Sequence, residues 1–150
     1  MERIQKSIEV ECPVSSVYNQ WTQFEEFPRF MEGVKQVKQI GDKRLHWVAE
    51  IAGKDKEWTA KIIDQIPDNR IAWESESGEY TSGCVNFQSV NPDRTKVILD
   101  MAYDPKGFVE NTGDALGLVS RRIENDLGKF KTFIENRGQE TGAWRGTIRE

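Results

Sequence analysis

Residues 111–136, NTGDALGLVSRRIENDLGKFKTFIEN, set the architecture of the chain. Their apolar residues recur at spacings of three and four, which places them in one stripe on a helix of 3.6 residues per turn. The stripe comprises Leu116, Val119, Ile123, Leu127, Phe130 and Ile134, with Phe133 on its flank. The pattern predicts an amphipathic helix about 36 Å long at 1.5 Å per residue.

Both ends of this helix carry capping signals. Asn111 followed by Asp114 is typical of an N-cap with an acidic third position, and Gly138 is typical of a helix stop. Gly117 and Gly128 fall on the far side of the stripe, where each costs about 1 kcal/mol relative to alanine. The helix therefore needs a large apolar surface to pack against.

The composition indicates one globular domain. The chain has 150 residues, 31% of them charged and 37% hydrophobic, and a net charge of −4 without a basic block. Nucleic acid is therefore a poor partner. No apolar run approaches the roughly 18 residues of a membrane span, and residues 1–10 lack the apolar core of a signal peptide. We expect a cytoplasmic protein without an integral membrane segment.

The inventory of reactive side chains is small. Cys12 and Cys84 lie in no CxxC or Cys/His cluster, and His46 is the one histidine of the sequence. A zinc site built on histidines, or a Ser-His-Asp triad through any other histidine, is thereby excluded. We expect free thiols, no metal and no cofactor. Alternation places His46 opposite Leu45 and Trp47, which favours a solvent-facing residue over a catalytic base.

The N-terminal third predicts a strand and two short helices. Residues 3–11 alternate as a half-buried strand, and residues 13–22 form a helix with Pro13 in its first turn. Residues 23–31, QFEEFPRFM, form a second short helix or a pair of turns, because the residue before a proline leaves the α region. The apolar side chains of this segment either plug one end of the core or gate the mouth of a cavity. The possible gate residues are Phe27, Phe30 and Met31.

Six further strands follow, separated by turn signals. They cover residues 34–40, 43–51, 56–66, 70–75, 79–90 and 95–103. Short connections predict an antiparallel meander, and residues 3–11 make a seventh strand. One face of the strands is apolar and the other mostly polar, as expected of a sheet that packs against the closing helix on one side. The chain is therefore predicted to be α+β, with a domain over residues 1–137.

Residues 138–150, GQETGAWRGTIRE, are glycine-rich and nearly without apolar residues, so they are predicted to be a tail. Trp144 is the exception, and it either docks on the domain or contacts a protein partner.

Several motifs, taken together, resemble those of one family. They are FEEFPRFM at 24–31, HWV at 46–48, EWTA at 57–60, PDNRIAW at 67–73, YDP at 103–105 and DLGKFK at 126–131. The chain resembles the bacterial polyketide cyclase/dehydrase family, near the Coq10-type proteins, within the START-like (SRPBCC), Bet v1-like helix-grip superfamily. The resemblance implies a curved sheet wrapped around the long helix. It also implies an apolar cavity that different members use for lipids, quinones or polyketides, and a few members catalyse aromatisation or cyclisation.

The residue sizes on the apolar face fit such a cavity but equally fit a solid core, because large aromatic side chains alternate with Ala49, Ala60 and Gly83. The predicted cavity residues are Trp47, Trp58, Trp73, Phe87, Leu99, Met101, Tyr103, Ser120 and Ile123. The hydroxyls of Tyr103 and Ser120 either bond to the backbone or orient an oxygen of a ligand.

Three functions remain open from the sequence. The first is binding or transport of a hydrophobic small molecule. The second is a polyketide aromatase/cyclase, which needs an acid or base inside the cavity. Arg70, Glu50 and Glu57 are predicted to face away from the tryptophans, so the sequence identifies no catalytic residue. The third is a protein-interaction domain that uses residues 24–31 and Trp144.

Overall fold

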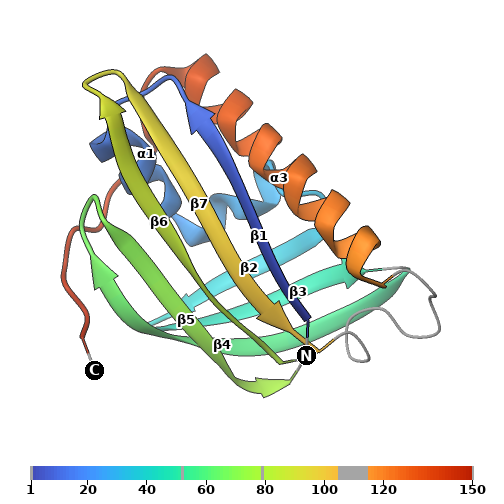
Figure 1. Ribbon diagram of the computed structural model, residues 1–150. Helices are drawn as coiled ribbons and strands as arrows, with labels where there is room; N and C mark the ends of the chain where they lie inside the picture. The colour runs from blue at the N-terminus through green and yellow to red at the C-terminus, as the bar shows by residue number, and fades with distance from the viewer. Residues whose placement is uncertain (1, 52, 79, 105–114, 150) are drawn as a thin grey trace.

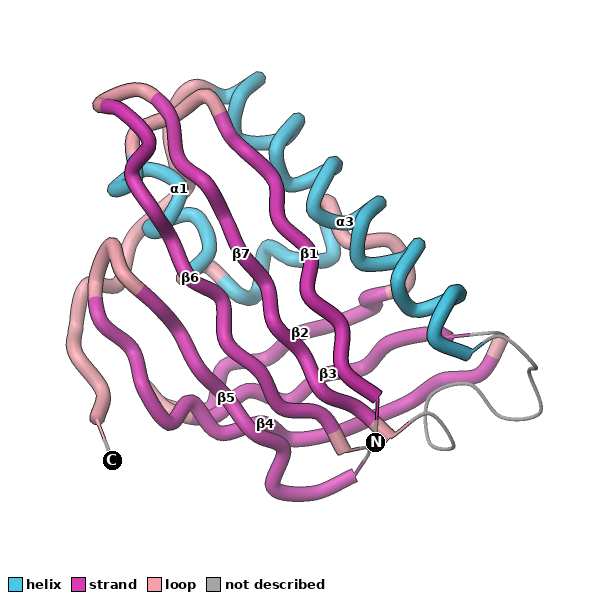
Figure 2. Tube along the Cα trace, viewed as in Figure 1, coloured by secondary structure: helices cyan, strands magenta, loops and turns pink. Residues whose placement is uncertain are grey.

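The computed structural model describes residues 2–51, 53–78, 80–104 and 115–149 (Figures 1 and 2). The helical segments are α1 (Val14–Trp21), the 3-10 helix η1 (Phe24–Arg29) and α3 (Ala115–Arg137). The strands are β1 (Glu2–Val10), β2 (Val34–Ile40), β3 (Arg44–Ile51), β4 (Lys54–Ile66), β5 (Arg70–Gly78), β6 (Thr81–Asn91) and β7 (Arg94–Tyr103). The predicted elements are therefore confirmed, with ends that coincide or differ by at most three residues, apart from the predicted start of the long helix, which lies outside the described residues.

The seven strands form one antiparallel sheet in the order β1-β7-β6-β5-β4-β3-β2. The predicted meander is confirmed, and β1 returns to pair with β7, with Ile4 opposite Met101. Figure 1 shows the sheet bending into a curved wall, and Figure 2 shows α1, η1 and α3 on its inner side. This is the α+β helix-grip architecture, in which the inner face of the sheet is closed by the C-terminal helix. None of the described helices combines the length and the apolar character needed to cross a bilayer.

The apolar stripe of α3 faces the core as predicted. Val119, Ile123, Leu127, Phe130 and Ile134 are all buried. The N-terminal capping residues Asn111 and Asp114, and the side chain of Leu116, lie outside the described residues. At the other end, Gly138 has a φ of 69°, and its N–H donates to the carbonyl of Ile134 at 2.9 Å. This left-handed stop confirms the predicted end of the helix.

Two glycines of this region allow a matched test of backbone conformation. Neither Gly128 nor Gly138 has any atom within 4 Å of an added Cβ, so an alanine changes only the backbone preference. We expect Gly128→Ala to stabilise the protein by about 1 kcal/mol, because Gly128 lies within the helix. We expect Gly138→Ala to destabilise it by about 1 kcal/mol, because alanine disfavours a positive φ. Urea unfolding measures both, and shifts of the same sign would contradict the assignment.

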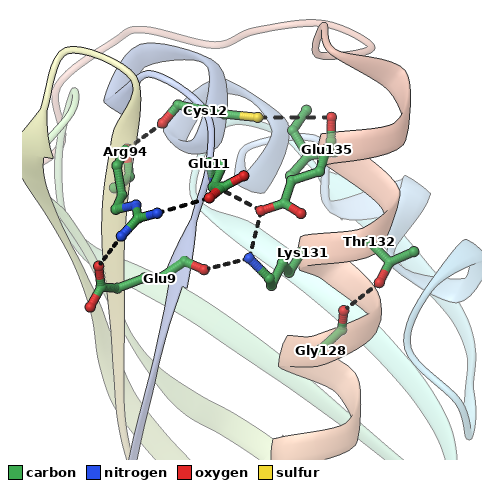
Figure 3. A network of polar contacts seen from close by, with 10 residues as sticks. Glu9, Glu11, Cys12, Arg94, Gly128, Lys131, Thr132 and Glu135 are labelled. Carbon is green, nitrogen blue, oxygen red and sulfur yellow. Dashed lines mark hydrogen bonds and ion pairs between the residues drawn. The ribbon is translucent and has the colours of Figure 1, made fainter.

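Polar contacts fasten the C-terminal half of α3 to β1 and β7 (Figure 3). Lys131 Nζ lies 2.6 Å from Glu135 Oε2 and 2.9 Å from the carbonyl oxygen of Glu9. The Glu135 carboxylate also accepts the N–H of Glu11 at 2.8 Å, and Arg94 pairs with the carboxylate of Glu11 at 2.8 Å. These contacts hold the helix beside β1, which is an edge strand of the sheet.

The segment after α3, predicted to be a tail, packs against the domain. Ile148 forms an antiparallel bridge with Gln65 of β4 and is only 4% exposed. Arg145 pairs with Asp68 at 2.8 Å and donates to Asn19 Oδ1 at 2.6 Å. Trp144 is half-buried against the core, and its main-chain N–H donates to Thr22 Oγ1 at 3.1 Å. Of the two alternatives predicted for Trp144, the structure shows docking on the domain. The other contacts are mostly polar, and a pattern of hydropathy does not predict polar contacts.

Candidate functional site

A cavity of about 200 Å³ lies between the inner face of the sheet, η1 and α3. The residues that line it are Trp21, Phe24, Phe27, Met31, Glu32, Gly33, Val34, Leu45, Trp47, Ala49, Trp58, Ala60, Ile62, Ile71, Trp73, Thr81, Leu99, Met101, Val119, Arg122, Ile123, Asp126 and Leu127. Most are apolar, so the interior suits an apolar guest.

Strand alternation and register shape the aromatic wall. Trp47 of β3 lies directly opposite Trp58 of β4, and their rings stack with centroids 5.7 Å apart and an interplanar angle of 8°. Ala49 and Ala60 lie on the same inner face, where their small side chains leave space beside the indoles. The alternation of large and small residues, which the sequence left open to two interpretations, therefore accompanies a cavity here.

A glycine determines how one further tryptophan fits. A Cβ on Gly83 would lie 2.3 Å from the carbonyl oxygen of Asp100 and 2.9 Å from the indole of Trp73. Since neither contact is sterically possible, only glycine lets the Trp73 indole lie this close to β6.

Six of the nine predicted cavity residues line the space. They are Trp47, Trp58, Trp73, Leu99, Met101 and Ile123. Phe87 is instead 5% exposed and packs edge-on against Tyr18, with ring centroids 5.3 Å apart. Tyr103 is fully buried in β7, and Ser120 is half-buried on α3, and neither is among the residues that line the cavity. The alternation along the strands thus correctly predicted that these side chains face the inside of the sheet. At Phe87, however, α1 occupies the space on that side.

Of the three predicted gate residues, two line the cavity and one packs in the core. Phe27 and Met31 line the cavity. Phe30 packs against Phe130 and Phe133 of α3, with ring centroids 5.4 and 5.0 Å away. The segment from Phe24 to Met31 therefore serves both as a plug of the core and as one wall of the cavity.

A polar cluster that the sequence analysis missed borders the cavity between α3 and the start of β2. We call Glu32, Arg122 and Asp126 the polar cluster. Arg122 Nη1 donates to the carbonyl oxygens of Glu32 at 2.9 Å and of Glu50 at 3.3 Å. The N–H of Glu32 donates to Asp126 Oδ1 at 3.2 Å. The Glu32 carboxylate accepts from Lys129 at 3.1 Å and from Asn125 at 3.2 Å.

Gly33 makes room for the guanidinium of this cluster. It has a φ of +89°, and a Cβ at this position would lie 1.9 Å from Arg122 Nη1 and 2.8 Å from the carbonyl oxygen of Glu50. Only glycine therefore allows both this backbone conformation and the observed position of the Arg122 guanidinium group.

Burial raises the pKa of the Asp126 carboxyl to about 7, because a partly dehydrated site disfavours the charged form. The positive charges of Arg122 and Lys129 and the N–H of Glu32 lower the pKa of Asp126, whereas the Glu32 carboxylate raises it. Asp126 is thus an acid that lines the cavity and titrates near neutral pH. Such a group is able to accept or donate a proton under physiological conditions.

A sequence signal for this cluster exists in hindsight. Arg122 and Asp126 are four residues apart on a helix and so share a face, next to Ile123 and Leu127 of the apolar stripe. Charged residues that flank a buried stripe are common on amphipathic helices, however, so the spacing does not by itself indicate a site.

The polar residues that the sequence analysis set aside do face away from the cavity. The His46 ring nitrogens lie 3.2 Å from Thr59 Oγ1 and 3.0 Å from Glu57 Oε1 on the outer face. Arg70 pairs with Asp64, and Glu50 with Lys35 at 3.6 Å. Cys12 is buried and Cys84 partly buried, both as free thiols. Within the described ranges, no three His, Cys, Asp or Glu side chains are grouped so as to hold a metal ion.

Comparison with known proteins gives matches in both sequence and structure. Residues 10–132 match the family described as polyketide cyclase/dehydrase and lipid transport. An uncharacterized 17.2 kDa protein of Streptomyces lincolnensis is 49% identical over 149 residues, 99% of each chain.

Among solved structures, the Zhui aromatase/cyclase of Streptomyces sp. R1128 aligns with a TM-score of 0.73 and 17% identity, over 95% of this chain and 99% of that one. A START superfamily protein of Mycobacterium smegmatis aligns with a TM-score of 0.68 and 16% identity, over 90% and 95% of the two chains. At these identities the structural matches show a shared fold.

Proposed function

Because this chain belongs to the polyketide cyclase/dehydrase and lipid transport family, we propose that it binds or carries a hydrophobic small molecule in the cavity between the sheet and α3. The observation that carries the proposal is the cavity itself, which is lined almost entirely by apolar and aromatic side chains. Transfer of apolar surface out of water stabilises binding by about 25 cal/mol per Å². The polar cluster at one side supplies hydrogen-bonding groups that orient a ligand.

The cavity-filling variant Ala60→Met tests this function. Ala60 is 1% exposed and lines the cavity, so the longer side chain occupies ligand space. We expect affinity for an apolar fluorescent probe such as 1-phenylnaphthalene to fall roughly tenfold, which is the size of a typical overpacking penalty. Probe fluorescence measures the affinity.

The matched control is Ala72→Met, the same substitution on the outer face of β5, which should leave probe affinity unchanged. Native mass spectrometry of protein purified from its source should also show a co-bound apolar compound. Bare protein in repeated preparations, together with no probe binding by the unsubstituted protein, would rule out the carrier function.

One observation favours a second candidate function, a polyketide aromatase/cyclase. This chemistry requires a general acid or base within reach of the substrate, and Asp126 lines the cavity with a pKa raised by burial to about 7. Tyr103, which the sequence predicted to line the cavity, is not among the lining residues.

The third function considered from the sequence, a protein-interaction domain, required residues 138–150 as an available contact surface. Because Trp144, Arg145 and Ile148 contact the domain itself, the structure offers no support for that function, and we do not propose it.

A further inference from the structure

Given a hydrophobic ligand in the cavity, as proposed above, we propose further that this ligand is uncharged and carries a hydrogen-bond-accepting oxygen. We propose that the Asp126 carboxyl holds this oxygen as a hydrogen-bond donor, and that binding takes up a proton from solvent.

The distribution of polar groups around the cavity supports a ligand with one polar end. Among the described residues that line the space, the charged side chains are Glu32, Arg122 and Asp126. Arg122 and Asp126 belong to α3, and Glu32 lies just before β2, so all three are at one side of the cavity. The sheet adds one hydroxyl, that of Thr81 on β6. The remaining lining is apolar, so the body of the ligand must be apolar and its polar atom belongs at the cluster.

The charges of the cluster disfavour an ionic ligand. An anion would meet the carboxylates of Glu32 and Asp126, and a cation would meet the guanidinium of Arg122, since these are the charged residues among those that line the cavity. Because Arg122 and Asp126 are partly buried, an unpaired ligand charge in contact with them is costly. An uncharged oxygen, as in a ketone, quinone or ester, avoids both penalties.

The donor in this proposal is the carboxyl group of Asp126. Its Oδ1 accepts the N–H of Glu32 at 3.2 Å, which is the hydrogen bond that the described residues make to this carboxyl group. Arg122 Nη1 donates to two backbone carbonyls beside Gly33. An ionised carboxylate only accepts hydrogen bonds, whereas a neutral carboxyl has one O–H to donate. Asp126 therefore contacts a ligand carbonyl favourably only after it takes up a proton.

The electrostatic surroundings make this protonation accessible near neutral pH. The charged groups that face Asp126 are Arg122 and Lys129 from α3 and Glu32 from the connection between η1 and β2. Glu50 of β3 reaches the cluster through its main-chain carbonyl. Burial already raises the pKa of Asp126 to about 7. An apolar ligand displaces further water from the cavity and raises this pKa again, which links binding to proton uptake.

Three probes that share one ring system test the inference. They are 2-isopropylnaphthalene, a hydrocarbon, 2-acetylnaphthalene, a neutral ketone of similar shape, and 2-naphthoate, an anion. Quenching of the tryptophan fluorescence measures their affinities at pH values of about 5.5 and 8.5. We expect the ketone to bind about tenfold tighter than the hydrocarbon at the lower pH and to lose this advantage at the higher one. The anion should bind most weakly at the higher pH.

Calorimetry of ketone binding in two buffers with different ionisation enthalpies counts the protons directly. We expect proton uptake on ketone binding just above neutral pH, where free Asp126 is mostly ionised.

Two variants at Asp126 distinguish the effect of a hydrogen-bond donor at this position from the effect of its titration. Asp126→Asn keeps an N–H donor but does not titrate, so it should prefer the ketone at both pH values. Asp126→Leu has no donor and should bind ketone and hydrocarbon alike. Glu124→Gln is the matched control on the same helix, because its carboxylate is 61% exposed, and it should behave like the unsubstituted protein.

The outcomes distinguish this inference from the function on which it rests. Equal affinities of ketone and hydrocarbon at the lower pH, tightest binding of 2-naphthoate, or a pH dependence that persists in Asp126→Asn would overturn the inference while leaving a hydrophobic carrier intact. Binding of no probe at either pH, in the unsubstituted protein and in Asp126→Leu, would overturn the proposed function itself.

Discussion

Phe130→Ala should lower the free energy of unfolding by about 4 kcal/mol, the cost of truncating a fully buried aromatic residue. Phe130 is 0% exposed and packs edge-on against Trp21 of α1 and Phe30, with ring centroids 5.0 and 5.4 Å away. It therefore joins the helical stripe to both short helical segments at once. Removal of its ring leaves a void among rigid aromatic neighbours that cannot close by small movements.

The matched control is Phe133→Ala, one turn further along the same helix. Phe133 is only partly buried, between the guanidinium groups of Arg29 and Arg137 at 5.3 and 5.7 Å from its ring centroid. We expect it to cost about 1 kcal/mol, because exposed cation–π contacts contribute little. Urea unfolding followed by circular dichroism measures both variants. Equal losses would show that Phe130 is not the centre of the aromatic packing.

Asp126→Asn should raise the free energy of unfolding by about 2 kcal/mol at a pH of about 8, the next largest effect that we expect. Burial raises the pKa of Asp126 in the folded protein to about 7. In the unfolded chain the pKa returns to about 4. Between these values the folded protein binds more protons than the unfolded chain, so stability is lost as the pH rises. Above about 7 the full penalty of an ionised, partly dehydrated carboxylate applies, and asparagine avoids it.

The measurement is urea unfolding of both proteins across the range from pH about 4 to 8, without ligand. The stability difference should be small at the acidic end, where Asp126 is neutral in the folded protein and about half protonated in the unfolded chain, and should grow with pH. Glu124→Gln, which alters an exposed carboxylate on the same helix, should show no such growth. A difference that stays constant with pH would show that Asp126 does not titrate near neutrality.

Local periodicity was sufficient to predict the helices, the strands and the antiparallel meander, whereas the family resemblance implied the curved sheet wrapped around the long helix. Leu45 and Trp47 alternate with His46, and the structure places the first two inward and His46 on the outer face. The three-four spacing along α3 likewise identified the residues that are buried. Gly138 and the turn sequences separated the elements because few residues other than glycine adopt a positive φ at low cost. All of these signals act between residues close together in the sequence.

The candidate site could not be predicted in the same way, because it is built from contacts between residues far apart in the sequence. Asp126 meets Glu32 across 94 positions of the sequence, and its pKa depends on how far the sheet stands from α3. Phe87 was predicted to line the cavity but packs against α1, and Ser120 is not among the residues that line it.

The amino-acid sequence by itself thus determined which face of each strand and of α3 is apolar, because alternation and helical spacing are properties of neighbouring residues. Only the tertiary structure decided whether those faces meet or leave a space of about 200 Å³ between them, and which charged groups border that space. The physical reason is that a cavity and the pKa of an acid beside it arise from the separation of packed elements, which the curvature of the whole sheet sets.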